Sequence, residues 1–409
     1  MVMKSVKLAS ILFYLNSVFV VFCFVSCGSS PTEASSLLTA DIRGGMDKPG
    51  LLGLGDEIKG VTFVPLEVTT DDASLIDGVY DYAVTDRYIY VLPVKEPRIV
   101  LFDRQGRFIR TLVKEGQGPG EFRGILPCIQ VDERNDRLFL FSNNRVWEYT
   151  LEGEFIGQST HEYSVIYMRH IGKDRFAAIS FPFQPFNGGG FGLGLFSRKG
   201  DTIAIKNDFY SFLLPHEKSG FTTSIAPAYS DAQNSVLFKT GSNDTVFCIS
   251  ADRISAACVL DLKNSDAEVI RSLDVTDMSN LRIEKKDPKD IFVQDMIEFP
   301  GHYYFRLLYN QGYYIASVDK KTGKTLVEKC VMPGSIYELA DANLQHGMQG
   351  TRSYRNFPVW GRVIKDELVQ VVTPYELNLY KSLRSITIPQ ELDLKGEEGN
   401  PVFVFYSLI

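Results

Sequence analysis

The stretch that decides the fold is GQGPGEF, Gly116–Phe122. Three glycines and a proline within seven residues do not suit the interior of a strand or helix. Glycine loses the most backbone entropy on folding, and proline lacks an N–H donor. Two similar segments flank the stretch, RIVLFDRQGRFI at 98–109 and NRVWEYTLEGEFI at 144–156. A glycine-rich stretch between two similar segments indicates a turn between structural repeats.

The repeats have a fixed length. Gly106, Gly153 and Gly200 each follow an apolar strand and precede a second β-favouring segment, and both intervals are 47 residues. Each glycine suits a hairpin turn that needs a positive φ angle. Repeats of about 45 residues with several short strands are typical of β-propeller blades, which bury their faces only against neighbouring blades. A β-sandwich would not explain the fixed interval.

The number of blades follows from the length of the repetitive part. More degenerate copies of the pattern occur near 235–260, 303–323 and 362–406, and the region 58–409 contains 352 residues. Seven blades of about 47 residues fit this length, but the evident insertions favour six longer blades. We therefore predict an all-β fold, a six-bladed β-propeller with four-stranded antiparallel blades, with seven blades as the second choice.

The N-terminal residues have the sequence pattern of a targeting segment. Lys4 and Lys7 precede an apolar run from Leu8 to Phe24, which is typical of a secretory signal peptide. We predict a signal peptide at 1–26, a flexible tether at 27–57 that is rich in Ser, Thr, Gly and Pro, and the propeller domain at 58–409.

The net charge and the histidine and cysteine content of the chain argue against some classes of ligand. The net charge is −7 and the pI is near 5.4, so a nucleic-acid partner is not expected. Five histidines without a CxxC pair or a Cys/His cluster predict no metal centre, and no motif indicates calcium. Cys248 and Cys258 flank an expected hairpin turn, and both a disulfide and two free thiols remain open.

A family resemblance supports this interpretation. GQGPGEF, followed by IQVD at 129–132, LFLF at 138–141 and VWEYT at 146–150, resembles an NHL-type blade. From about residue 60 onward the chain resembles the six-bladed NHL/TolB-like propeller lipoproteins of Bacteroidetes. FVSC at 24–27 is similar to a lipobox, with Phe24 in place of the usual leucine. The resemblance implies cleavage before Cys27, a lipid on its thiol and a place in the cell envelope. The single acidic residue soon after Cys27 favours the periplasmic side over the cell surface.

The richest polar and aromatic cluster is TRSYRNFPVW at 351–360. Arginine forks bind carboxylates and phosphates, aromatic rings offer stacking faces, and inter-blade loops often carry binding groups. We predict ligand contacts from Arg352, Tyr354, Arg355 and Trp360; the alternative is an ordinary solvated loop. The aromatic stretch 181–191 is a second candidate of the same kind.

Arg169 and His170 are the other candidates. They follow the apolar segment 165–168, which we predict to be the innermost strand of a blade. Inner strands line the central channel of a propeller, so these two side chains are expected to face a ligand there. The alternative is that they are ordinary strand residues.

Two functions remain open. The first is a non-catalytic binding platform at the cell envelope for a glycan, peptide or protein partner, anchored to the membrane by its lipid. The second is a propeller-type hydrolase or lyase with its active site at one mouth of the channel. The fold alone does not separate them. Buried charges with shifted pKa values that converge at one channel mouth would favour the enzyme, and an open aromatic rim would favour binding.

Overall fold

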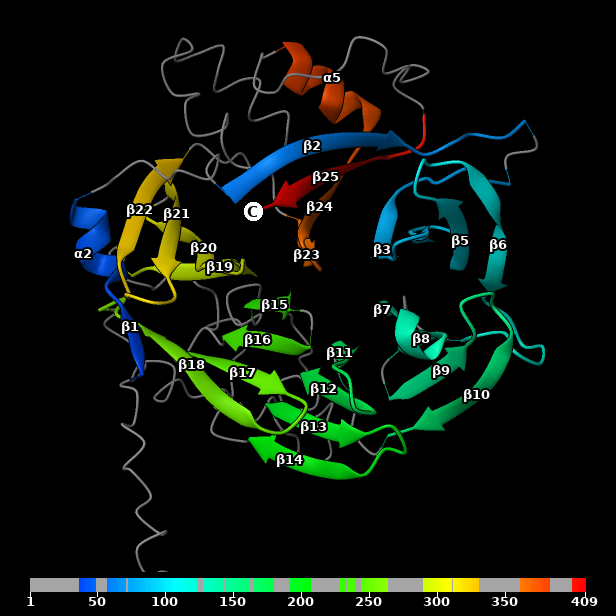
Figure 1. Ribbon diagram of the computed structural model, residues 1–409, viewed down its shortest axis with the longest axis horizontal. Coiled ribbons are helices and arrows are strands. Elements are labelled where there is room, and N and C mark those ends of the chain that lie inside the picture. Colours follow the sequence, from blue (N-terminus) through cyan, green and yellow to red (C-terminus); the bar gives the residue numbers. More distant parts are fainter. Residues whose placement is uncertain are drawn as a thin grey trace, which may run out of the picture. The chain divides into compact units, whose positions relative to one another are not determined.

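Short apolar strands, each ended by a turn, build the part of the chain that the structure describes. The computed structural model describes residues 37–48, 57–70, 73–123, 128–142, 144–161, 165, 167–179, 192–206, 228–232, 234–239, 244–263, 290–310, 312–330, 361–382 and 399–409. The strands are rich in Val, Ile, Phe and Tyr, which suit a pleated, half-buried surface. They form six sheets arranged in a ring (Figure 1). The predicted six-bladed β-propeller is therefore confirmed, and seven blades are excluded.

Each blade has four antiparallel strands, named here from the centre of the ring outward. Blade 1 contains β3 (Val79–Val84), β4 (Tyr88–Pro93), β5 (Arg98–Asp103) and β6 (Phe108–Lys114). Blade 2 contains β7 (Cys128–Asp132), β8 (Arg137–Ser142), β9 (Arg145–Tyr149) and β10 (Phe155–Thr160). Blade 3 contains β11 (Tyr167–His170), β12 (Arg175–Ile179), β13 (Leu193–Ser197) and β14 (Thr202–Lys206).

The second half of the ring follows the same order. Blade 4 contains β15 (Ala228–Ala232), β16 (Ser235–Lys239), β17 (Thr245–Ser250) and β18 (Ile254–Leu260). Blade 5 contains β19 (Phe292–Glu298), β20 (His302–Tyr309), β21 (Gly312–Asp319) and β22 (Thr325–Cys330). Blade 6 contains β23 (Arg362–Ile364), β24 (Glu367–Val372), β25 (Val402–Leu408) and β2 (Ile58–Pro65). The 3-10 turn η2 (Glu133–Asn135) follows β7, and helix α5 (Pro374–Ser382) follows β24.

The ring closes by joining strands from both ends of the propeller sequence. β2 is the outermost strand of blade 6 and pairs antiparallel with the C-terminal strand β25. Next to this pair, the buried Asn400 side chain bridges blade 6 to the start of blade 1. It accepts a hydrogen bond from the Ile76 N–H (2.7 Å) and donates to the carbonyls of Glu67 (2.7 Å) and Ser74 (2.8 Å). All the polar atoms of this buried amide are used, which avoids the cost of an unpaired group.

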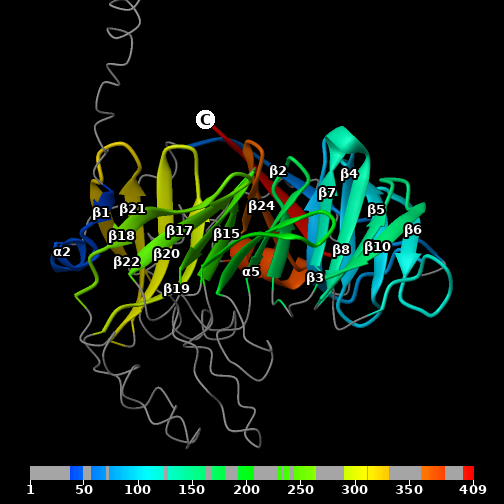
Figure 2. The same cartoon turned by 90° about the horizontal axis from the view of Figure 1, so that it is seen from below.

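The folded unit begins earlier than the sequence suggested. The predicted tether at 27–57 includes β1 (Leu38–Ala40), which pairs in parallel with β18, and α2 (Ile42–Asp47), which packs beside β22 (Figure 2). Ala40 and Ile42 are fully buried in the core shared by blades 4 and 5. The compact unit spans Leu38–Ile409, so it includes part of the predicted tether, whereas the first propeller strand, β2, begins at Ile58. The composition of this segment is typical of a linker, but its apolar residues pack against strands that are distant in the sequence, and this packing gives the segment a defined structure.

The GQGPGEF stretch is the connection between blades 1 and 2, as predicted. Glu121 accepts a hydrogen bond from the Gly118 N–H (2.7 Å), and the Gly116 N–H donates to the Phe122 carbonyl (3.1 Å). A Cβ atom on Gly116 would lie 1.9 Å from Glu121 Oε2, so a larger residue there would displace the Glu121 carboxylate. Phe122 is fully buried against Trp147, with ring centroids 6.4 Å apart. Phe122 therefore packs into the interface between the two blades, as expected.

The cysteines and helices add two observations. Cys248 and Cys258 are free thiols. Strand register places Cys258 opposite Val246 and Cys248 opposite Ser255, so no Cys248–Cys258 disulfide forms.

Within the described ranges, no helix has the length and apolar character needed to cross a bilayer.

Candidate functional site

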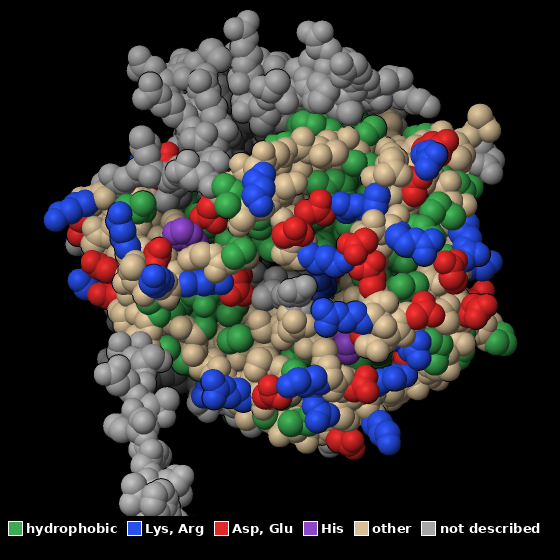
Figure 3. Space-filling model, viewed as in Figure 1, with side chains coloured by type: hydrophobic (Ala, Val, Ile, Leu, Met, Phe, Trp, Pro, Cys, Tyr) green, Lys and Arg blue, Asp and Glu red, His purple; other side chains and the backbone are tan. Residues whose placement is uncertain are grey.

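A pocket of about 690 Å³ opens at one mouth of the central channel. Blades 1, 2, 3, 4 and 6 all contribute to its wall, at the end where the first strand of each blade turns into the second. Basic and acidic side chains gather around this part of the ring (Figure 3). The charged and amide residues of the lining are Asp86, Gln130, Asp132, Glu133, Arg134, Asn135, Arg169, His170, Lys173, Asn234 and Lys365. Below, this site is called the channel-mouth pocket.

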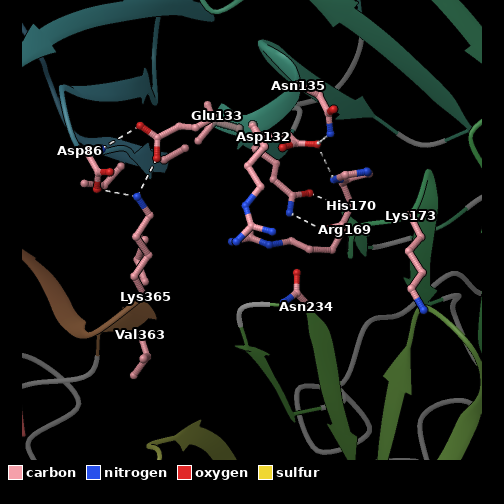
Figure 4. A pocket seen from close by; sticks show the side chains of 17 residues that line it. Asp86, Asp132, Glu133, Asn135, Arg169, His170, Lys173, Asn234, Val363 and Lys365 are labelled. Carbon is pink, nitrogen blue, oxygen red and sulfur yellow. Dashed lines mark hydrogen bonds and ion pairs between the residues drawn. The ribbon is translucent and has the colours of Figure 1, made fainter.

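Lys365 joins three blades at the rim of the pocket. Its ammonium donates hydrogen bonds to Asp86 Oδ1 (2.5 Å) in blade 1 and to Glu133 Oε2 (2.7 Å) in blade 2 (Figure 4). Glu133 Oε1 also accepts from the Asp86 N–H (2.9 Å). Partial burial lowers the pKa of Lys365, but the hydrogen bonds to Asp86 and Glu133 outweigh burial and raise the pKa above its usual value. Lys365 is thus a structural cation whose charge is balanced by two carboxylates.

Asp81 braces the same three blades deeper in the wall. It is only 3% exposed and forms an ion pair with Arg362 of blade 6. Asp81 Oδ2 accepts from the Ile129 N–H of blade 2 (2.7 Å), and Asp81 Oδ1 accepts from the Tyr82 N–H (2.9 Å). Burial of a carboxylate is tolerable when it is paired and hydrogen-bonded in this way. The wall of the pocket is therefore rigid on the side of blades 6, 1 and 2.

A second brace links blade 2 to blade 3. The Gln130 side-chain amide donates to the His170 carbonyl (2.7 Å) and accepts from the His170 N–H. Gln130 has the same place in β7 that Asp81 has in β3, the third residue of the inner strand. Equivalent positions of two repeats therefore serve the same purpose, each linking its own blade to the next around the pocket.

His170 lies beside Asp132 in the wall. Its Nδ1 is 3.7 Å from Asp132 Oδ2, and its ring stacks on Phe139 with centroids 5.1 Å apart. Burial lowers the pKa of His170 below its ordinary value, and the carboxylate of Asp132 opposes that shift. Asp132 Oδ2 also accepts from the Asn135 side chain (2.7 Å). The imidazole is therefore neutral near pH 7, and its carboxylate neighbour already has a hydrogen-bond donor.

Arg169 has a different position from its neighbour. His170 turns toward Asp132, whereas the long Arg169 side chain extends across the middle of the pocket, above Asn234 (Figure 4). Arg134, on η2, also lines the pocket and is exposed to solvent. Two guanidinium groups from two blades thus belong to one cavity. Guanidinium groups recognise planar and tetrahedral oxyanions through a fork of N–H donors.

The comparisons with known proteins agree with the fold. Residues 37–407 match the family model described as "Domain of unknown function (DUF4934)". The chain belongs to this family. A crystal structure described as a "Putative exported protein" from Bacteroides fragilis NCTC 9343 is similar to this DUF4934 domain. The match covers 91% of this chain and 99% of that chain, with a TM-score of 0.62 and 14% sequence identity.

More distant matches are also found. The WD40 β-propeller domain of Doa1 matches over 66% of this chain and 71% of that chain, with a TM-score of 0.33 and 12% identity. No curated protein sequence matches the DUF4934 chain. At 14% identity, the similarity to the Bacteroides fragilis structure shows a shared fold.

The sequence-predicted residues of this DUF4934 member have different outcomes. Arg169 and His170 lie in the innermost strand of blade 3 and line the pocket, as the placement predicted; a ligand role for them stays a prediction. The cluster Arg352, Tyr354, Arg355 and Trp360 lies outside the described residues, as do the stretch 181–191 and Cys27. Within the described ranges, no group of three or more His, Cys, Asp or Glu residues has the geometry of a metal site.

Sequence reasoning missed the residues of the turns. Asp86, Glu133 and Lys365 each come just after the inner strand of their blade, as do Lys173 and Asn234. The prediction placed binding groups on loops between blades and, with Arg169 and His170, on an inner strand; the described pocket combines inner strands with the turns that follow them within blades. The repeat pattern contained the needed signal, because equivalent turns of a closed ring must meet around its axis.

Proposed function

We propose that this protein is an exported, membrane-tethered β-propeller that binds a small ligand, or the end of a larger one, in the channel-mouth pocket without catalysing a reaction. The observation that supports this proposal is the convergence of polar side chains from five blades on one cavity of about 690 Å³. Ligand pockets typically have volumes of about 300–1,000 Å³ and a few well-placed polar groups.

The rigidity of the wall supports binding. Asp81, Gln130 and Lys365 hold neighbouring blades together through their side chains, so the cavity is preformed. A preformed site loses little conformational entropy when a ligand binds. These contacts join blades 1, 2 and 3 to blade 6, whose inner strands come from the C-terminal part of the sequence, so the pocket exists only in the closed ring.

The tethering part of the proposal rests on FVSC at 24–27 and on the exported relative of the same fold. The compact unit begins at Leu38, eleven residues after Cys27. Eleven residues span at most about 40 Å, so a lipid on Cys27 would keep the propeller close to the membrane. We assign the site to the cell envelope, on the periplasmic side.

The lipid anchor has a direct test. Replacing Cys27 by alanine should abolish incorporation of labelled palmitate, because the lipid is attached through the thiol. The measurement is metabolic labelling in a bacterial host, with Cys128→Ala as the matched control that retains the label. Equal labelling of the Cys27→Ala variant and the unchanged chain would reject the anchor.

The enzymatic alternative is favoured by one observation, the buried His170 beside Asp132. A neutral imidazole next to a carboxylate can act as a general base. Among the described lining residues, however, there is no Ser, Thr, Cys or Tyr to serve as a nucleophile or proton donor. Asp86 and Glu133 are held by Lys365. We therefore place binding ahead of hydrolysis or elimination.

Blocking the pocket tests the proposed function. Asn234 lies in an exposed turn and faces the cavity, so Asn234→Trp should fill the entrance without disturbing the core (Figure 4). A ligand found by a thermal-shift screen of glycans, peptides and metal ions against the unchanged chain should bind this variant at least tenfold more weakly. Isothermal titration calorimetry measures the change.

Gln105→Trp provides the matched control, because Gln105 is an exposed turn residue of blade 1 that does not line the pocket. Its affinity should equal that of the unchanged chain. If Asn234→Trp binds the ligand as tightly as Gln105→Trp does, the ligand site lies elsewhere and the proposal fails.

A further inference from the structure

We infer that the ligand of the channel-mouth pocket carries an oxyanion group, a carboxylate, sulfate or phosphate, which Arg169 and Arg134 receive. This inference rests on the proposed function, because it names the chemical class of the ligand for the same site. Three observations support it: the balance of charge in the lining, the way in which each carboxylate is held, and the position of the two guanidinium groups.

The first observation is the charge of the wall. The lining contains four Arg or Lys residues and three Asp or Glu residues, although the whole chain has a net charge of −7. The lining therefore has an excess of positive charge, whereas the net charge of the whole protein is negative. The walls of the cavity concentrate the field of its cations, because the surrounding protein has a low dielectric constant.

The second observation is that the carboxylates have donors within the wall. Lys365 holds both Asp86 and Glu133, and the Asn135 amide holds Asp132 next to His170. The Asp86 side chain is also 78% exposed, which places it at the outer rim rather than over the cavity floor. Little negative charge is therefore left to repel an anion in the middle of the pocket.

The third observation is the placement of the cations. Arg169 extends across the centre of the cavity from blade 3 (Figure 4). Arg134, on η2 of blade 2, also belongs to the lining. Lys173 belongs to the same lining, but its ammonium binds Asp252 at the surface (3.0 Å). Two guanidinium side chains in the lining of one cavity favour an oxyanion over a neutral ligand. The Asn234 amide below Arg169 adds a neutral donor and acceptor to the same cavity.

The lining also argues against a purely apolar or a stacking ligand. Among the described lining residues, His170 has the only aromatic ring, and that ring is buried against Phe139. Ala83, Val84, Val131, Val363 and Ile364 supply small apolar patches between the charges. A ligand with a short apolar body and one or two anionic groups fits this wall, whereas recognition of a neutral sugar ring normally needs an exposed aromatic face.

The test uses matched pairs of probes that differ only in charge. Trigalacturonate is compared with galactotriose, a triglutamate peptide with its triglutamine analogue, and sulfate and phosphate ions are titrated alone. Each probe is measured by calorimetry against the full chain and the variants Arg169→Gln, Arg134→Gln and Arg145→Gln. Arg145 is exposed on β9 and outside the pocket, so it controls for the loss of one positive charge.

We expect at least one anionic probe to bind more tightly than its neutral partner by at least tenfold. Its affinity should fall about ten- to hundredfold in Arg169→Gln, which corresponds to the loss of a charge-assisted hydrogen bond, and should not change in Arg145→Gln. Arg134→Gln should weaken it in the same direction, and raising the salt concentration should weaken it further. Because Arg134 is exposed, its variant stays folded even if Arg169→Gln does not.

Two results would overturn the inference. If the neutral member of a pair binds as tightly as the anionic one, and Asn234→Trp blocks both, the pocket is a binding site but not for an anion. If no probe of either charge binds, or if Asn234→Trp leaves all binding unchanged, the proposed function fails together with the inference. The two failures are therefore distinguishable.

Discussion

Replacing Phe122 by alanine should lower the free energy of unfolding by about 3–5 kcal/mol. Phe122 is fully buried, and it packs against Trp147 in the core that blades 1 and 2 share. The truncation removes apolar contacts from both blades and leaves a cavity that the rigid ladders on either side cannot fill. Urea unfolding followed by tryptophan fluorescence measures the loss, since Trp147 is 2% exposed and lies beside the substituted ring.

Phe155→Ala is the matched control for this substitution. Phe155 is 45% exposed on the outermost strand of blade 2, so the same truncation should cost less than half as much. If the two variants were equally destabilised, the interface between blades 1 and 2 would not depend on the GQGPGEF turn. Phe122 would then not be the residue that anchors this turn in the interface.

Asp81→Ala should have a comparable effect for a different reason. The substitution removes the partner of Arg362 and the acceptor of the Ile129 and Tyr82 N–H groups. A partly buried guanidinium that loses its carboxylate, together with buried N–H donors that lose their acceptor, costs about 3–5 kcal/mol. The loss should appear as a lower midpoint in urea unfolding with an unchanged slope. Asp81→Asn should be milder, because its amide oxygen can still accept one of these hydrogen bonds.

Asp252→Asn is the control for the loss of an ion pair. Asp252 and its partner Lys173 are both exposed at the surface, so breaking this pair should cost less than about 1 kcal/mol. A small effect of Asp81→Ala, similar to that of Asp252→Asn, would mean that the wall of the pocket is not braced across blades 6, 1 and 2.

The fold was predictable because its determinants are local and repeated. Gly106, Gly153 and Gly200 all adopt positive φ angles in the structure, at 82°, 87° and 95°. A hairpin of fixed type needs glycine at a fixed place, and the interval between such glycines is the length of a blade. Phe122 was placed correctly for the same reason, since an apolar residue directly after an inter-blade turn has only the interface in which to be buried.

The N-terminal arm was not predictable by the same means. Leu38–Ala40 is three residues long and pairs with β18, more than 200 residues away in the sequence. No local period marks a strand of that length, and its glycine- and proline-containing surroundings are typical of a linker. Its order comes from burial of Ala40 and Ile42 in the core of blades 4 and 5, which exists only after the ring has formed.

The amino-acid sequence by itself determined the propeller, its six blades, the turn at Gly116–Phe122 and the inner-strand position of Arg169 and His170. Turn chemistry and strand period are local properties, and the sequence encodes them directly. Only the tertiary structure decided which turns meet. Asp86, Glu133 and Lys365 come from three repeats, and closure of the ring brings their charges within hydrogen-bond distance. The pocket they surround is a property of the closed ring, because no single blade contains more than a fraction of its wall.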